Sequence, residues 1–248
     1  MSQDADLALC RSALFEALAL GFRPPNPETV ARLASPDRAA GLVVAAEAVG
    51  GEPLGALARR LAATDSPLGV LTHAYQCLFG HVARGEVPLY ETEYGGDELF
   101  LQPQELADVG GFYAAFGLRL APAAGERADH VSCESEFLMF LARKEAFALE
   151  HGDSTMLQGT RAASRLFLRD HLGRFLPALN DRLERVDPSG FYAALGALAT
   201  AFVRRECERL GVPAGPESLR LRMAIEDRIP MACGACPLGA ADELGDGD

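Results

Sequence analysis

Helical periodicity is the feature that most constrains the fold of this chain. From residue 4 to residue 22, apolar side chains recur at steps of three and four positions, as they do on one face of an amphipathic helix. Comparable stripes follow along the chain, separated by glycine and proline residues that begin or end helices. No segment sustains the alternation of apolar and polar residues that is typical of a strand. The sequence therefore predicts an all-α fold, a bundle of about eight to ten helices.

The predicted helices are bounded by capping residues and by proline and glycine. They cover residues 4–22, 26–33, 39–49, 53–63, 67–79, 103–116, 154–171, 175–186 and 188–210, with one more that begins at Asp129 and a short one near 219–227. We divide the chain into an N-terminal helical lobe (1–80), an ordered acidic loop (81–102), a C-terminal helical lobe (103–210) and a tail (211–248). A structureless stretch as long as 81–102 is uncommon in a compact domain and tends to be functional.

The charge balance argues against nucleic acid as a partner. The chain carries 23 Lys and Arg residues against 35 Asp and Glu residues, a net charge of −12, and no basic patch offsets it. The six cysteines are too sparse for a disulfide framework. The N-terminus lacks the basic and apolar regions of a signal peptide, and no apolar run reaches the ~18 residues of a membrane span. We therefore expect a cytoplasmic protein with no stable membrane insertion.

The common catalytic motifs are missing from the sequence. It has no Glu-x-x-His pair for a di-iron centre, no His-x-x-x-His zinc pair, no Gly-x-Ser-x-Gly elbow and no Gly-x-Gly-x-x-Gly loop. The single lysine, Lys144, is followed by Glu145, so a Walker-type phosphate loop is absent as well. We expect a protein that is not an enzyme and that holds no cofactor.

The Asp129-His130 pair has two interpretations. Asp129 can be the N-cap of the following helix, accepting hydrogen bonds from backbone N–H groups two and three residues on, with His130 packed in the first turn. Alternatively, the junction between loop and helix exposes both polar side chains toward a groove. The spacing favours the cap.

The loop 81–102 combines acidic with aromatic residues. One interpretation is a docking surface for a basic, partly apolar peptide, in which carboxylates pair with arginines and rings supply contact area. The other is a solvated acidic loop whose aromatic residues fix it to the core, and the spacing does not decide between the two. The candidate peptide-binding residues of this loop are Tyr90, Glu91, Glu93, Tyr94 and Phe100.

Cys233 and Cys236 form a Cys-x-x-Cys pair in the tail. Such a pair is half of a structural zinc site, or a redox pair. Zinc needs two further ligands, and neither a second Cys-x-x-Cys pair nor a histidine after His171 is there to supply them. We expect the segment 231–238 to pack on the body of the protein as a cysteine-bearing turn without a metal. A small metal-binding or redox module organised by this pair is the alternative function.

Several segments together resemble a known family. They are the stretch Tyr75-Gln76-Cys77-Leu78-Phe79, the segment 106–118, and a helix start with Asp129, His130, Glu134, Phe137 and Met139. Their order resembles the TorD/DmsD/NarJ family of cytoplasmic chaperones for molybdenum oxidoreductases, whose hallmark is similar to Glu-x-Pro-Asp-His-x-x-x-Glu-Leu-x-Phe-Met. Here Ala128 replaces the proline, and Ser135 replaces the hydrophobic residue after the glutamate. The tail and the segment 111–118 look like the branch that serves ethylbenzene dehydrogenase, dimethylsulfide dehydrogenase and selenate reductase.

The resemblance covers residues 4–210 and implies a TorD-like helical fold without catalysis. It also implies a partner, the apo catalytic subunit of a molybdenum oxidoreductase with its twin-arginine leader. Such chaperones bind the signal peptide or the N-terminal region and delay export until the cofactor has been inserted. Asp129, His130 and Glu134 match the hallmark and are therefore further candidates for peptide-binding residues.

Overall fold

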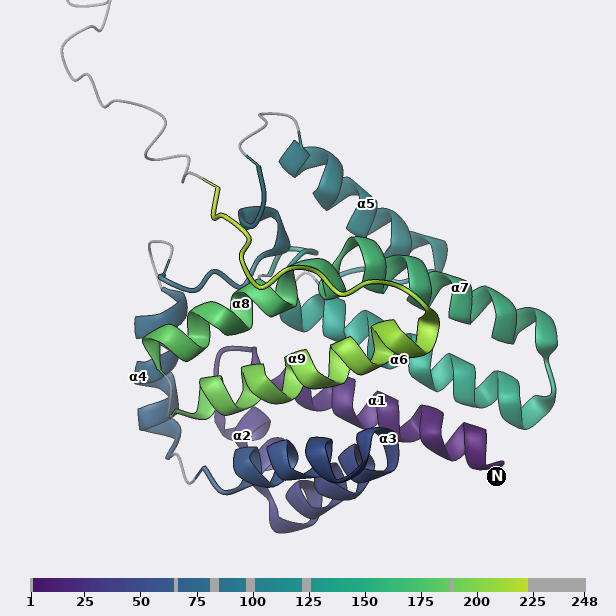
Figure 1. Cartoon of the computed structure of the whole chain (residues 1–248), viewed down its shortest axis with the longest axis horizontal. Helices are drawn as coiled ribbons and strands as arrows, with labels where there is room; N and C mark the ends of the chain where they lie inside the picture. Colours follow the sequence, from purple (N-terminus) through teal and green to yellow (C-terminus); the bar gives the residue numbers. More distant parts are fainter. Residues whose placement is uncertain are drawn as a thin grey trace, which may run out of the picture.

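The prediction of an all-α fold is confirmed. The computed structural model describes residues 2–64, 67–80, 85–96, 101–121, 126–187 and 190–222. Within these ranges the chain forms nine α-helices, one short 3-10 helix and no strand (Figure 1). The elements are α1 (Gln3–Gly21), α2 (Pro27–Ala34), α3 (Pro36–Ala62), α4 (Leu68–Phe79), η1 (Glu91–Glu93), α5 (Leu101–Ala115), α6 (Val131–His151), α7 (Ser154–Asp170), α8 (Leu172–Val186) and α9 (Phe191–Leu210).

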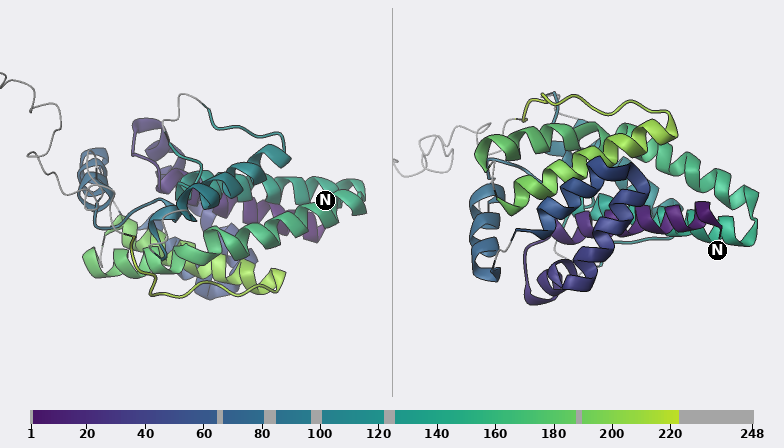
Figure 2. Two further views of the ribbon diagram at one scale, coloured as in Figure 1. Left: turned by 90° about the horizontal axis from the view of Figure 1, so that it is seen from above. Right: turned by 60° about the horizontal axis from the view of Figure 1, so that its bottom comes forward.

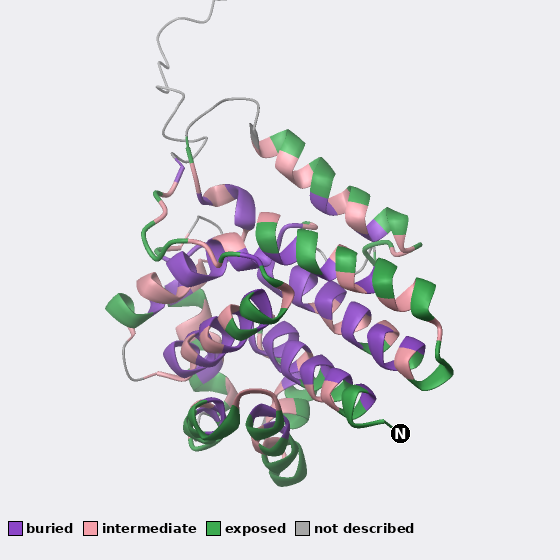
Figure 3. Ribbon diagram, turned by 45° about the vertical axis from the view of Figure 1, so that its right-hand side comes forward, coloured by how far each residue is buried: buried purple, intermediate pink, exposed green. Residues whose placement is uncertain are grey.

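The helix α1 lies inside the bundle. It packs mainly on α6 and also on α3 and α9, and Figure 3 shows buried positions along this helix, which starts at the N label. Leu14, Phe15 and Leu18 are buried on α1, and the ring centroid of Phe15 lies 4.6 Å from that of Phe202 on α9. Buried side chains from both predicted lobes join one hydrophobic cluster. The division into lobes stays a prediction, and the core is continuous across it.

The helix α3 contains the break that the sequence predicts between 49 and 53. The helix spans the whole range, but Gly51 interrupts its regular backbone geometry with φ 67° and ψ −162°. Glycine alone adopts this conformation readily, and Pro53 follows two positions later. By length and mean hydropathy, α3 is the one helix of the described ranges that could span a membrane. In the structure it packs against α1, α2 and α9 as a member of the bundle.

Several boundaries differ from the prediction. The helix α3 begins at Pro36 rather than at 39, α8 begins at Leu172 rather than at 175, and α9 begins at Phe191 rather than at 188. The helix α5 begins at Leu101 rather than at 103, and the preceding loop contains the 3-10 helix η1. Residues 219–222 are extended instead of helical, and Leu221 forms an isolated bridge with Tyr94. The rest of the tail, including the predicted cysteine-bearing turn, lies outside the described residues.

Residues 211–222, which we call the strap, run over α8 and α9 and return to the loop 85–96 (Figure 2). Two backbone hydrogen bonds of 2.9 Å join the strap to that loop. Gly95 donates from its N–H to the carbonyl of Arg220, and Arg222 donates to the carbonyl of Glu93. The strap therefore brings the C-terminal end of the described chain next to the loop that carries most of the candidate residues.

Candidate functional site

The loop 85–96 packs against the start of α6, and we call this contact the junction. It collects most of the residues that the sequence singles out. Asp129, His130, Glu134, Glu91 and Tyr94 are buried, Tyr90 and Glu93 are half-buried, and Phe100 lies outside the described residues. The structure therefore brings together candidates that are separated by some 40 positions in the chain.

Asp129 joins the loop to the helix through its carboxylate. Thr92 donates to Oδ2 from its backbone N–H at 3.2 Å and from its hydroxyl at 2.7 Å. Arg127 forms a bidentate ion pair with the same carboxylate, with Nε 3.0 Å from Oδ1 and Nη2 2.7 Å from Oδ2. The backbone carbonyl of Asp129 also accepts from the N–H of Glu91 at 2.8 Å. Asp129 therefore fixes the loop 85–96 on the start of α6.

His130, rather than Asp129, is the N-cap of α6. Its Nδ1 accepts a hydrogen bond from the backbone N–H of Ser132 at 3.1 Å. The prediction that Asp129 caps the helix was wrong, because the loop and Arg127 occupy its carboxylate. The alternative, in which both side chains are exposed toward a groove, was wrong as well, since at most 1% of either residue is exposed.

Burial keeps the imidazole of His130 neutral. Removal from water lowers its pKa to about 4, although the nearby carboxylates of Glu126 and Asp129 act in the opposite direction. The cap requires this neutral form, because Nδ1 accepts a hydrogen bond and so carries no proton. The ring meets Tyr90 edge-on with centroids 5.1 Å apart, and Tyr90 donates from its hydroxyl to Glu126 at 2.8 Å.

Glu91 is a buried ion-pair partner and not a surface acid. Its Oε2 lies 3.0 Å from Nδ1 of His171, and its Oε1 lies 2.8 Å from Nη2 of Arg174. Both partners come from the meeting point of α7 and α8, so Glu91 holds the loop to that side of the bundle. With its side chain 1% exposed, Glu91 is not available at the surface. Its predicted contact with a peptide would require the loop to move.

Tyr94 fixes the same loop to the core. It is fully buried, and its hydroxyl donates to the carbonyl of Pro88 at 2.8 Å. Its ring lies against that of Phe175 on α8, with centroids 5.5 Å apart. This placement agrees with the interpretation in which aromatic residues anchor the loop.

Glu134 is a buried acid whose two carboxyl oxygens have no hydrogen-bond partner among the described residues. Burial raises its pKa well above the ordinary range, and the charges of Glu91 and Asp129 raise it further. Burial beside two carboxylates therefore favours the neutral carboxylic acid form of Glu134. A neutral acid adds no further charge to the junction, which a third carboxylate would destabilise.

Arg222 closes the junction from the end of the strap. The residue is 2% exposed, and its Nε and Nη1 donate at 2.8 Å to the carbonyls of Gly96 and Thr92. Its Nη1 and Nη2 also reach the carboxylate of Glu105 on α5 at 2.7 and 3.0 Å. Gly95 has φ 133°, and a Cβ atom there would lie 2.9 Å from the guanidinium, so a glycine is needed at this position. The guanidinium thus ties the strap, the loop and α5 together.

Sequence reasoning missed four partners at the junction: Arg127, His171, Arg174 and Arg222. They lie in separate segments and belong to no motif, so their common role depends on tertiary contacts. One local signal exists, since His171 and Arg174 are three positions apart and face the same side at the start of α8.

An apolar pocket of about 270 Å³ lies beside the junction, between α6 and the chain that follows α5. We call it the α5–α6 pocket. It is lined by Tyr113, Leu118, Arg119, Leu120, Cys133, Glu136, Phe137, Met139 and Phe140. The first two turns of α6 therefore place some residues of the matched segment in the junction and others in the pocket wall.

The described residues contain no group of three or more His, Cys, Asp and Glu side chains that could hold a metal ion. The predicted metal candidates, Cys233 and Cys236, lie outside those residues. Among the described free cysteines, burial raises the pKa of Cys133 and Cys207 to about 11. Both thiols are therefore protonated and unreactive near neutral pH.

Comparisons with known proteins identify the family. The family model described as "Nitrate reductase delta subunit" matches residues 46–181, more than half of the chain. The selenate reductase assembly chaperone of Thauera selenatis is 35% identical over 103 residues, 42% of this chain and 51% of that protein. The perchlorate reductase assembly chaperone of Dechloromonas aromatica is 31% identical over 109 residues, 44% of this chain and 48% of that protein. The chaperone protein TorD of Vibrio cholerae is 33% identical over 92 residues, 37% of this chain and 40% of that protein.

The chain spans about half the length, or less, of these curated relatives. The stretch that the family model matches includes the loop 85–96, the start of α6 and the α5–α6 pocket. The relatives carry the names of chaperones and not of enzymes. This chain belongs to the nitrate reductase delta subunit family, the TorD/DmsD/NarJ family that its sequence resembles.

Proposed function

We propose that this protein is a system-specific assembly chaperone for a molybdenum oxidoreductase. It binds the twin-arginine signal peptide or the N-terminal region of the apo catalytic subunit, assists cofactor insertion and delays export. It works in the cytoplasm and catalyses no reaction. The family membership and the chaperone names of the relatives support this proposal.

We assign the client peptide to the α5–α6 pocket. The observation that carries this assignment is that the segment with the family motif also forms a wall of the pocket. Leu118, Leu120 and Phe140 give the pocket an apolar surface, and Leu120 is 39% exposed. The apolar stretch that follows the arginines of a leader peptide can bury its side chains in such a pocket.

Glu136 gives the rim of the pocket a partner for a basic residue. Its carboxylate pairs with Arg23 at 2.5 Å, and the side chains of Arg23 and Glu136 are 34% and 43% exposed. An exposed pair of this kind contributes at most about 1 kcal/mol. An arginine of a bound leader can therefore replace Arg23 at little cost.

In this proposal most of the predicted site residues act indirectly. Asp129, His130 and Glu134 hold the loop and the start of α6 in place, so they are positioning residues for the pocket wall. Tyr90 and Glu93, which are half-buried, stay candidates for direct contact with a peptide.

The test is binding of a synthetic twin-arginine leader, measured by isothermal titration calorimetry. We expect Leu120→Asp to weaken binding at least tenfold, or about 1.4 kcal/mol, because the apolar segment would meet a carboxylate. The matched control is Val186→Asp at the end of α8, where the parent residue has a similar exposure of 42%. Unchanged affinity of Leu120→Asp, with an unchanged melting temperature, would place the client outside the pocket.

The alternative function, a metal-binding or redox module organised by Cys233 and Cys236, is not favoured by the names of the relatives. A double variant, Cys233→Ser with Cys236→Ser, separates the two functions. The chaperone proposal expects this variant to bind the leader peptide as the parent does. A module built on the pair would instead lose its metal binding or its redox activity.

A further inference from the structure

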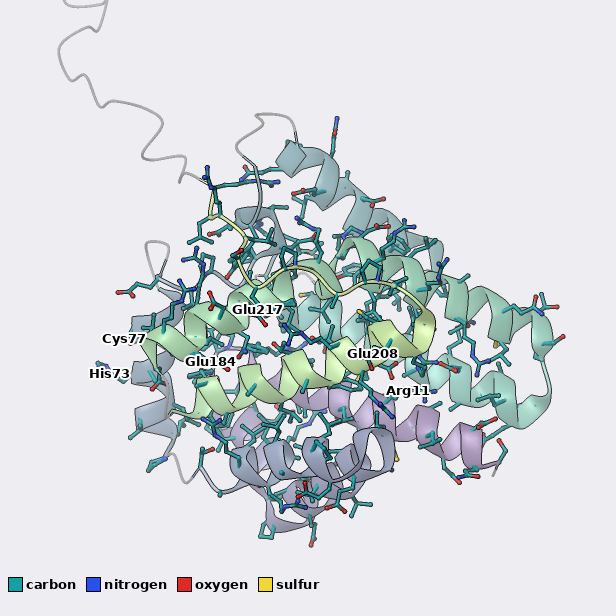
Figure 4. The ribbon with its side chains drawn as sticks, in the orientation of Figure 1. Arg11, His73, Cys77, Glu184, Glu208 and Glu217 are labelled. Atoms are coloured by element: carbon teal, nitrogen blue, oxygen red, sulfur yellow. The ribbon has the colours of Figure 1, made fainter. Side chains whose placement is uncertain are left out.

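His73 and Cys77 lie on one face of α4. Residues four positions apart are neighbours on a helix surface, and here Nε2 of His73 is 3.6 Å from Sγ of Cys77. Both residues are exposed. The helix stands at an edge of the molecule, where Figure 4 labels the two side chains and Figure 2 shows α4 from two other directions. Neither the motif at the junction nor the α5–α6 pocket uses them.

We propose that His73 and Cys77 form a two-ligand site for a thiophilic metal ion such as Zn²⁺. Zinc binds thiolate sulfur at ~2.3 Å and histidine nitrogen at ~2.0–2.1 Å, so a tetrahedral ion holds these two ligands ~3.5–3.6 Å apart. The two donor atoms already have this separation in the structure. Without the ion the same geometry makes a weak hydrogen bond between the thiol and the imidazole. When the metal binds, it takes the place of the thiol proton.

The surroundings of the pair determine how the ion is held. The helix α4 carries no charged residue, so it offers no cation of its own to repel a metal. No third His, Cys, Asp or Glu side chain of the described ranges completes the site. Within the described ranges, two positions of a tetrahedral ion therefore remain for water or for other ligands. An ion bound in this way exchanges more easily than one in a closed four-ligand structural site.

Zinc titration of the full chain by calorimetry tests the proposal. The parent carries Cys233→Ser and Cys236→Ser, so that the cysteine pair of the tail does not contribute. We expect one zinc ion per chain and at least a tenfold loss of affinity in His73→Ala and, separately, in Cys77→Ser. The controls are His151→Ala, an exposed histidine with no cysteine four positions away, and Cys10→Ser, a cysteine with no histidine at that spacing. Both controls should bind zinc as the parent does.

A titration with Co²⁺ gives a second readout, since thiolate coordination produces an absorption band that should disappear in Cys77→Ser. Both substitutions are at exposed positions, and thermal melts should show folded variants. Zinc affinity that is unchanged in either His73→Ala or Cys77→Ser overturns the proposal, because the pair would then not be the site. Leader binding should be unchanged in both variants, so the outcome is independent of the proposed chaperone function.

Discussion

At the scale of single residues, Asp129 makes more contacts than a helix cap requires. Its carboxylate accepts hydrogen bonds from Thr92 and Arg127, and the contacts with Thr92 connect the loop to α6. We expect Asp129→Ala to lower the free energy of unfolding by about 2–3 kcal/mol, since hydrogen bonds to a buried charge are lost. Urea denaturation measures this change.

The control for Asp129 is Asp153→Ala, which removes an ordinary N-cap. Asp153 accepts from the backbone N–H of Met156 at 2.9 Å at the start of α7, and losing such a cap costs about 1 kcal/mol. Equal losses in the two variants would mean that Asp129 contributes no more than a cap.

The sequence predicts that Asp129 and His130 stand at a helix start, but it does not predict which of them caps the helix. A cap is a local contact, and either residue can make one. The choice follows from Thr92, which lies far away in the chain and reaches Asp129 only in the folded protein. By contrast, the caps made by Asn26 and Asp153 have no such competitor, and both helices start where the sequence predicts.

Glu134 makes the stability of the protein depend on pH. Its pKa is raised by burial in the folded state, so above the unfolded value of ~4.3 the folded state keeps a proton that the unfolded chain releases. The contribution of Glu134 to stability is therefore complete below pH ~4 and decreases as the pH rises, by up to ~1.4 kcal/mol per pH unit. Replacing Glu134 with Gln removes this dependence, and the variant should gain stability relative to the parent between pH ~5 and ~8. Urea titrations across this range test it, and parallel curves would show that Glu134 is ionised in the folded state.

At the scale of elements, the strap explains why the loop 85–96 is held in one conformation. Without it, the carbonyls of Thr92 and Gly96 would lose the donors that Arg222 supplies. The sequence predicts a helix near 219–227, and residues 219–222 are not helical. The prediction fails there because the local pattern carries no information about an arginine that binds loop carbonyls and Glu105. The break in α3, in contrast, is predictable, since Gly51 and Pro53 act through their own backbone conformations.

We expect Arg222→Ala to lower the free energy of unfolding by about 2–3 kcal/mol, since the charged hydrogen bonds to the carbonyls of Thr92 and Gly96 and to Glu105 are lost. Hydrogen exchange should show the loss locally: the N–H of Gly95, which bonds to Arg220, should exchange faster than in the parent.

The matched control within the strap region is Arg204→Ala. Arg204 pairs with Glu217 of the strap, but the two side chains are 43% and 67% exposed, and such a pair contributes about 0–1 kcal/mol. If Arg204→Ala freed the N–H of Gly95 as much as Arg222→Ala, the buried guanidinium would not be the anchor.

At the scale of the whole molecule, a second buried group of charges joins four helices. Arg11 of α1 lies 3.2 Å from Glu145 of α6 and 3.7 Å from Glu206 of α9, and Figure 4 labels Arg11 on α1. Arg209 contacts both acids, and Arg161 of α7 donates to Glu145 at 2.8 Å. These contacts cross between the two predicted lobes, so the helices of both depend on the same ion pairs.

Among these charged residues, Glu145 contacts three arginines. We therefore expect its removal to lower the free energy of unfolding most. Burial alone would raise its pKa, but the charges of Arg209 and Arg11 outweigh burial and lower it. Its contribution to stability is therefore present above the unfolded pKa of ~4.3 and is lost as the pH falls through the lower folded value. We expect Glu145→Ala to cost about 3–5 kcal/mol near neutral pH, since Arg11 would stay buried without its nearest carboxylate. This difference from the parent should shrink below pH ~4.

The control is Glu47→Ala on α3, which breaks a pair with Arg59. The Glu47 side chain is 46% exposed, so this substitution should cost at most about 1 kcal/mol. Similar losses in the two variants, or a Glu145→Ala difference that persists in acid, would mean that the buried charges do not hold the helices together.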